Sequence, residues 1–216
     1  MKRKTLDILF SLGGLVLAGL LLVAGLVLTS NASFARTYVA DQLSQQNVVF
    51  TPADKLSLEE KKAACLTTYA GQQLTTGKQA ECYANEYIGL HLKSIAGGKT
   101  YADLGAPQTQ LKAQIAQAQT DSPSTVAGLQ KQLADVTAQR ETVFKGETLR
   151  GLLLTSYGFS EFGTKAAQAA TVVYLAGGLL LLLAIAGFLH ALVTPRTKAF
   201  AVPEPRPSTV GKAVTA

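Results

Sequence analysis

Two long stretches without a formal charge constrain this chain more than any other feature. Ile8–Leu28 contains no charged residue, and Ala166–Val193 contains a single histidine, His190, and no formal charge. A helix needs about 20 apolar residues to cross a bilayer core, and both stretches meet that length. A core helix of a soluble domain would be shorter and would carry a polar face. We therefore predict an all-α chain in which two transmembrane helices, residues 8–30 and 166–193, frame a helical domain.

The first stretch has a second interpretation, a cleaved signal peptide. Met1–Lys4 is basic, and Ser33–Ala35 loosely matches a cleavage site. The apolar core of a signal peptide is about 7 to 15 residues long, which is shorter than Ile8–Leu28, so we favour an uncleaved anchor. No Gly or Pro interrupts the chain between this stretch and Leu43, which predicts a helix that continues beyond the membrane.

Charge orients the two spans. The net charge is +6, yet residues 31–168 hold 13 basic and 12 acidic side chains, so the excess lies outside the central region. Basic residues beside transmembrane helices mark the cytoplasmic side. We predict a plasma-membrane protein with cytoplasmic ends (residues 1–7 and a disordered tail, 194–216) and an extracytoplasmic domain, residues 31–165. The excess charge is an orientation signal at the bilayer and not a nucleic-acid footprint.

Cys65 and Cys82 are the two cysteines, and both lie in the central region. In an oxidising compartment an even number of cysteines usually forms disulfides. Two unpaired buried thiols are the alternative. A bridge that closes a loop of this size would contribute about 3 kcal/mol in the chain-entropy model. We favour the disulfide because the charge pattern independently places both residues outside the cytoplasm.

The central region contains several local signals. Residues 47–52 end at Pro52, and they are expected to be extended because the residue before a proline disfavours helical backbone. Ser57 and Glu60 form a capping-box pattern that predicts a helix to about Tyr69. Residues 79–95 repeat apolar and aromatic side chains at helical spacing, and Gly97-Gly98 would end that helix. Its expected buried face is Ala80, Tyr83, Ala84, Tyr87, Ile88, His91 and Ile95.

The next part of the central region has two interpretations. Residues 108–120 and the helix that starts at Val126 flank a turn at residues 121–124, where Pro123 suits a first helical position. The apolar spacing fits either a helical hairpin with a narrow seam or a core helix of a compact bundle. Residues 147–162 are rich in large apolar side chains and fit either the membrane interface or core packing at the base of the domain.

Small residues form one stripe on each predicted span. Such stripes allow helix backbones to approach closely, either between the two spans or with partner helices. In the first span the stripe is Ser11, Gly14, Ala18 and Gly25; in the second it is Gly177, Ala184, Gly187 and Ala191.

None of the motifs that could carry chemistry is complete, so we expect no catalytic residue, cofactor or metal ligand. Residues 96–100 mimic the end of a phosphate-binding loop, but Lys93 stands where that motif needs glycine. Residues 158–162 fail the nucleophile elbow for a similar reason. The two histidines, His91 and His190, lie on opposite sides of the membrane in this topology and cannot share a metal. His190 is either an interfacial anchor or a proton relay.

Two stretches carry a resemblance. They are Tyr69–Leu92 (YAGQQLTTGKQAECYANEYIGLHL) and Gly146–Leu154 (GETLRGLLL). Both are similar to stretches of actinobacterial two-span membrane proteins of unknown role, which often carry the automatic label aromatic ring-opening dioxygenase. That label implies an iron site with paired histidines, a pattern from which this chain departs. The resemblance implies a host class and a topology, and no activity.

Three function classes follow. The first is a non-catalytic accessory or interaction subunit of a bacterial plasma-membrane assembly, in contact with the bilayer and with other membrane subunits or itself. The second is an extracytoplasmic ligand-binding or sensing protein, with a pocket among Tyr83, Tyr87, His91 and Tyr101, which predicts an apolar cavity with a few polar groups. The third, a membrane enzyme, requires clustered acid–base groups that the sequence does not offer.

Overall fold

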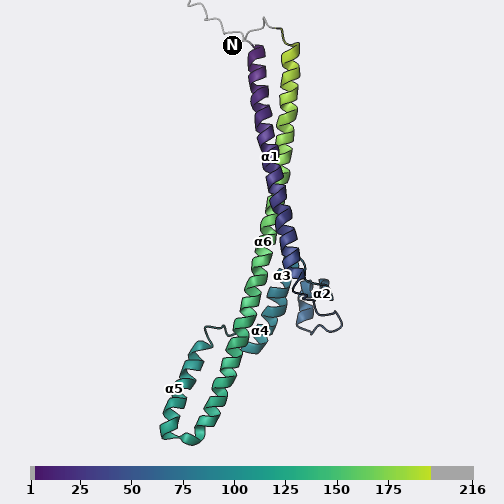
Figure 1. The fold of residues 1–216 in the computed structure, drawn as a ribbon. Coiled ribbons are helices and arrows are strands. Elements are labelled where there is room, and N and C mark those ends of the chain that lie inside the picture. The colour runs from purple at the N-terminus through teal and green to yellow at the C-terminus, as the bar shows by residue number, and fades with distance from the viewer. Residues whose placement is uncertain (1–2, 196–216) are drawn as a thin grey trace, which may run out of the picture. The chain divides into compact units, whose positions relative to one another are not determined.

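The computed structural model describes residues 3–195, so nearly all of the predicted tail, from position 196 onward, lies outside the described residues. All regular elements in this range are helical (Figure 1). They are α1 (Arg3–Ser44), η1 (Glu60–Lys62), α2 (Ala64–Thr68), α3 (Gly77–Cys82), η2 (Tyr83–Ile88), α4 (Gly89–Ala96), α5 (Gly105–Asp121), η3 (Pro123–Thr125) and α6 (Val126–Val193). The chain divides into two compact units: unit 1, Met1–Leu28 with Ala169–Ala216, and unit 2, Thr29–Gln168.

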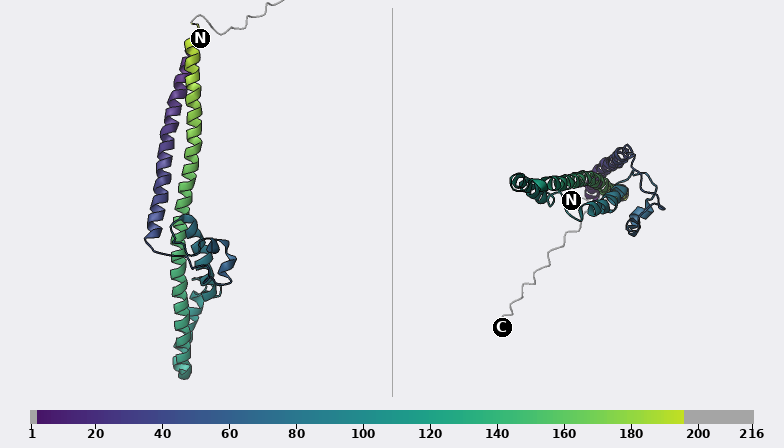
Figure 2. Two further views of the ribbon diagram at one scale, coloured as in Figure 1. Left: turned by 90° about the vertical axis from the view of Figure 1, so that its right-hand side faces the viewer. Right: turned by 90° about the horizontal axis from the view of Figure 1, so that it is seen from below.

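Unit 1 consists of the apolar parts of α1 and α6, which run side by side (Figure 2). Both helices are long and apolar enough to cross a membrane. Their outward side chains have no protein cover: Leu26 is 63% exposed, Leu175 71% and Leu182 66%. A core helix of a soluble domain would bury such residues, whereas a bilayer would solvate them without cost.

Unit 2 is built around one apolar core. Its largest fully buried side chains are Phe50, Leu66 and Leu74. The core also includes Val39 from α1 and Leu153 from α6, so segments far apart in the sequence share it. Leu153 belongs to residues 147–162, and this part of α6 therefore packs at least partly into the core. The predicted continuation of the first helix beyond its apolar stretch is confirmed, because α1 ends at Ser44.

Residues 48–52 are extended, as predicted, whereas Asn47 lies in a turn with φ +51°. Val49 forms an isolated antiparallel bridge with Gln73. The backbone N–H of Phe50 donates to the carbonyl of Gln72 (2.9 Å), and the N–H of Leu74 donates to the carbonyl of Val48 (2.9 Å). These bonds satisfy backbone groups beside two of the most buried side chains in the unit.

The single helix predicted from Ser57 to Tyr69 is wrong. The capping pair itself is present: the N–H of Ser57 donates to Glu60 Oε2 (2.8 Å), and the N–H of Glu60 donates to Ser57 Oγ (3.2 Å). The turn it starts ends at Lys62, because Ala63 is extended (φ −84°, ψ 102°) before α2 begins. The break in the helix at Ala63 accompanies the burial of Leu66 in the core. Tertiary packing here outweighs the local capping signal.

The helix predicted over residues 79–95 is present, but its expected buried face is wrong beyond Ile88. His91 is exposed and Ile95 is 46% exposed, whereas Leu92 and Ala96 are 8% and 3% exposed. The cause is η2, a π-helical segment between α3 and α4. Its i→i+5 bonds insert one extra residue, which shifts every later side chain around the helix axis. Gly97, with φ +58°, ends α4 in the left-handed conformation predicted for this position.

For residues 108–143 the structure contains the hairpin alternative. The turn at Ser122–Thr125 joins α5 to α6, and Pro123 occupies the first position of η3 as predicted. Two contacts connect the helices: Gln108 Nε2 donates to Thr137 Oγ1 (2.9 Å), and Arg140 donates to Gln108 Oε1 (2.8 Å). The apolar side chains of this seam are half-buried, as expected for two helices that share a single narrow contact.

Candidate ligand cavity

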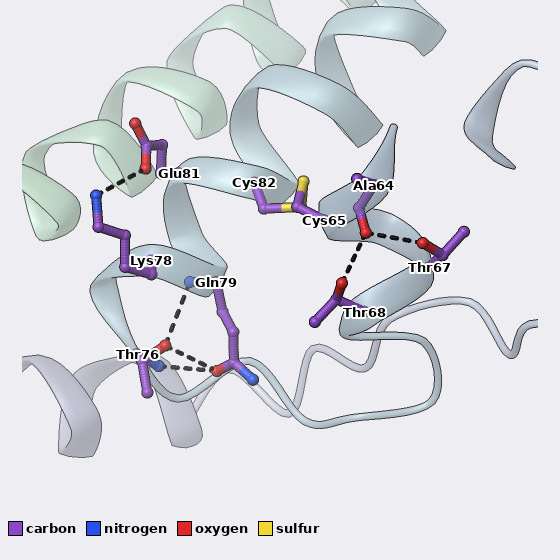
Figure 3. Close-up of a disulfide and its surroundings, with 9 residues drawn as sticks. All are labelled: Ala64, Cys65, Thr67, Thr68, Thr76, Lys78, Gln79, Glu81 and Cys82. Carbon is purple, nitrogen blue, oxygen red and sulfur yellow. Dashed lines mark hydrogen bonds and ion pairs between the residues drawn. A yellow bond between two sulfur atoms is a disulfide. The ribbon is translucent and has the colours of Figure 1, made fainter. Parts of the chain in front are cut away.

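A disulfide joins α2 to α3 in unit 2. Cys65 and Cys82 are bonded, with their Cα atoms 6.0 Å apart (Figure 3). Both cysteines in the chain are therefore paired, and the predicted bridge is present. It anchors the last residue of α3, directly before Tyr83, the first residue of the π-helical segment.

A second capping box, which sequence reasoning missed, starts α3. The N–H of Gln79 donates to Thr76 Oγ1 (3.2 Å), and the N–H of Thr76 donates to Gln79 Oε1 (3.0 Å; Figure 3). Thr76 and Gln79 have the Ser/Thr-x-x-Glu/Gln spacing that identified Ser57 and Glu60, so the same pattern could have found them. The box and the disulfide hold α3 at both of its ends.

Lys78 ties α3 to α6 at the surface of unit 2. Its Nζ lies 3.1 Å from the hydroxyl of Tyr157, 3.3 Å from Glu81 and 3.4 Å from Glu161. The hydrogen bond to Tyr157, with smaller contributions from the two carboxylates, raises the pKa of Lys78. The ammonium stays protonated, and its charge is matched locally by its two acidic neighbours.

The predicted ligand face contains a stack of rings. Tyr83 and Tyr87 lie 4.6 Å apart between ring centroids, and Tyr87 and His91 lie 4.4 Å apart. His91 Nδ1 is also 2.8 Å from the carbonyl oxygen of Tyr87. Tyr101 does not join them, because it packs on Phe144 (5.6 Å between centroids) and beneath the Arg140 guanidinium. Of these four predicted residues, one, Tyr83, lines the cavity described next.

Unit 2 contains an apolar cavity of about 500 Å³. Its walls come from the end of α1, from the segment that follows α1, from Leu74 and Tyr83, and from α6. The lining residues are Tyr38, Val39, Gln42, Leu43, Gln46, Val48, Leu74, Tyr83, Leu149, Leu152, Leu153, Thr155, Ser156 and Phe159. Cavities of this size, with mainly apolar walls and a few polar groups, are typical of small-molecule sites.

No residue that lines this cavity carries a formal charge. Burial and the neighbouring Tyr87 raise the pKa of Tyr83, so its hydroxyl stays neutral. The hydroxyls of Thr155 and Ser156 donate to backbone carbonyls of their own helix, at 2.9 and 3.2 Å. Gln42 and Gln46 are exposed, and neither carboxamide forms a hydrogen bond within residues 3–195. Within the same residues, these two carboxamides, with the hydroxyls of Tyr38 and Tyr83, are the unengaged hydrogen-bonding groups of the wall.

In unit 1 the structure brings the two small-residue stripes together. A Cβ atom placed on Gly14 would lie 3.6 Å from the Cβ of Ala184, and one on Gly25 would lie 2.5 Å from the ring of Tyr174. Gly187 packs directly against Ser11. Ala18, which faces Gly177, and Ala191 are also buried. The sequence left open whether the stripes pack against each other or against partner helices. In the structure they form the contact between α1 and α6.

His190 has a partner that sequence reasoning missed. Its Nδ1 lies 3.0 Å from Asp7 Oδ2, and both side chains are partly exposed. Asp7 directly precedes the first apolar stretch, so the antiparallel pairing of two spans could have suggested it. A partly exposed contact of this kind adds little stability and fits an anchor at the end of unit 1.

Fold and cavity together define a class: a helical chain with two helices that could cross a membrane and a disulfide-linked helical unit with an apolar cavity. Within residues 3–195 no group of three or more His, Cys, Asp or Glu side chains could hold a metal ion. No family model, curated protein or solved structure matches this chain significantly.

Proposed function

We propose that this chain is a non-catalytic, two-span plasma-membrane protein whose extracytoplasmic unit binds an apolar ligand. The cavity between α1 and α6 in unit 2 carries the proposal, because it combines apolar walls with unengaged carboxamides. The small-residue stripes, which an accessory subunit would offer to partners, are occupied by the contact between α1 and α6. This occupancy favours ligand binding over the accessory role.

The proposed orientation is supported by charge and by the disulfide. Basic residues gather beside the two apolar stretches, at both ends of the chain, whereas unit 2 is nearly neutral. A Cys65–Cys82 bridge is stable in an oxidising compartment and rare in a bacterial cytoplasm. Both features are expected if unit 2 lies outside the cytoplasm.

The orientation predicts which introduced cysteines react in intact cells. Ser124→Cys, at the exposed turn between α5 and α6, should react with a membrane-impermeant maleimide before permeabilisation. Thr5→Cys, also exposed, should react only after permeabilisation. The native cysteines are bonded to each other and supply no background. Labelling of Thr5→Cys and protection of Ser124→Cys in intact cells would reverse the proposed topology.

Ligand binding predicts where a photoreactive apolar probe becomes attached. We expect a diazirine-bearing long-chain alcohol, added to the full-length protein in phosphatidylcholine vesicles, to cross-link peptides that contain residues 38–48 and 149–159. Leu152→Trp fills the cavity from a side chain that is 63% exposed, so it should reduce these cross-links without unfolding the unit, by about fivefold or more. Leu58→Trp, outside the cavity and 81% exposed, is the matched control. Labelling confined to the apolar spans would refute ligand binding.

A second candidate function, an accessory subunit, is favoured by one observation. Phe34, Tyr38 and Phe159 gather on unit 2, with ring centroids 5.7 to 6.3 Å apart, and are 61%, 49% and 37% exposed. Exposed large apolar side chains mark interaction surfaces when they gather. Purification in mild detergent followed by mass spectrometry separates the two functions: a stoichiometric protein partner supports the accessory role, and its absence removes it.

A further inference from the structure

The chemistry of the cavity narrows the class of ligand that it accepts. Val39, Leu43 and Leu153 are buried core residues of its wall, and Leu74 is fully buried. Leu149, Leu152 and Phe159 extend the apolar surface along α6. A ligand that contacts this surface must present a chain or ring system without polar groups, because a buried polar group without a hydrogen bond costs free energy.

Two basic groups next to α6 residues of the cavity wall are already engaged. Lys78 is held by Glu81 and Glu161. Arg150, one residue after Leu149, is bonded to Asn85 (3.2 Å) and Glu147 (3.3 Å). A charged head group would therefore enter an apolar site with no counter-charge in its wall. At the exposed Gln42 and Gln46 a charged head would gain no ion pair, and a charge drawn into the apolar part of the cavity would be unpaired.

The polar groups that remain suit an uncharged head. Gln42 lies in the last turn of α1 and Gln46 in the turn that follows Ser44, and both line the cavity. Each carboxamide offers two N–H donors and one acceptor oxygen. Such groups pair with hydroxyls, esters or amides and supply no formal charge that would balance a charged head.

We propose that the cavity binds a single-chain amphiphile with an uncharged, hydrogen-bonding head, of which a monoacylglycerol is the simplest example. The head bonds to Gln42 and Gln46, and the chain lies against the accessible side chains of Leu149, Leu152 and Phe159. The source is the bilayer, because both helices that form the walls, α1 and α6, also carry the apolar spans. This inference rests on the proposed ligand-binding function and names the chemistry of its ligand.

The test compares two photoreactive probes with the same chain in phosphatidylcholine vesicles that contain the full-length protein. One probe is a monoacylglycerol and the other an alkyl sulfate, whose charge does not depend on pH. We expect the monoacylglycerol to cross-link the peptides of residues 38–48 and 149–159 about tenfold more efficiently than the sulfate. Gln42→Lys supplies a counter-charge and should reverse this preference. Gln45→Lys, on an exposed neighbouring residue that does not line the cavity, should leave it unchanged.

Each outcome has one meaning. Equal cavity labelling by the two probes overturns the uncharged-head inference and leaves ligand binding intact. An equal response to Gln42→Lys and Gln45→Lys also overturns it, because the lysine would then act through general surface charge. Absence of cavity labelling by both probes, with normal labelling of the spans, refutes the proposed function itself.

Discussion

Replacement of both Cys65 and Cys82 by serine is expected to lower the free energy of unfolding of unit 2 by about 3 kcal/mol in the chain-entropy model. The bridge spans a sequence separation of 17 residues. It holds α2, a helix of five residues that is too short to be stable alone. Cys82 is also 4% exposed, so serine would place a hydroxyl in the core and add to the loss.

The same substitution should weaken the cavity. Tyr83 follows Cys82 directly and lines the cavity. Without the disulfide, α3 and η2 can move, and the ring of Tyr83 moves with them. The measurement is urea unfolding of the detergent-solubilised protein, followed by near-ultraviolet circular dichroism. Reductant should shift the midpoint of wild type most of the way toward that of the double variant and leave the double variant unchanged. Coincident midpoints for oxidised wild type and double variant would show that the bridge contributes nothing.

Gly177→Leu in unit 1 is expected to cause the second large loss of stability, because it separates α1 from α6. A Cβ atom at this position would lie 3.2 Å from the Cβ of Leu21 and 3.5 Å from the backbone oxygen of Ala18. A leucine side chain extends further and must separate the two helices. Overpacking of this kind costs about 1 to 3 kcal/mol, and here it also removes the close contact on which the association of membrane helices depends.

The adjacent glycine supplies the matched control. A Cβ atom on Gly178 meets nothing within 4 Å, so Gly178→Leu adds the same side chain to the same helix without a clash. Unfolding of both variants by sodium dodecyl sulfate in mixed micelles compares them. We expect a lower midpoint for Gly177→Leu and a midpoint near wild type for Gly178→Leu. Equal midpoints would mean that the stripes do not pack tightly.

Features that depend on near neighbours were predicted well. The two apolar stretches, the small-residue stripes at intervals of three, four and seven, the extended segment before Pro52 and the left-handed end at Gly97 were all read from local patterns. In each case the physical cause lies within a few residues: apolar content, the absence of a side chain, or a restricted backbone.

Features that depend on the register between distant segments were missed. Local patterns gave no sign of the extended residue Ala63 or of the π-helical turn at Tyr83–Ile88, which exposes His91 and buries Leu92. Each improves the burial of core side chains at the expense of regular helical geometry. Because burial is decided by what lies opposite, a period of 3.6 residues cannot anticipate an inserted residue.

The sequence by itself determined the helical class, the two apolar helices and the positions of the small-residue stripes, because these follow from composition and short-range spacing. The structure decided that the cysteines are bonded and that the two stripes face each other. Only the tertiary structure decided the cavity, since its walls combine residues 38–48 with residues 149–159, about a hundred positions apart. The same holds for the pairing of Asp7 with His190. Such sites arise when a folded chain places distant segments side by side, and their individual residues carry no local signature that marks them as neighbours.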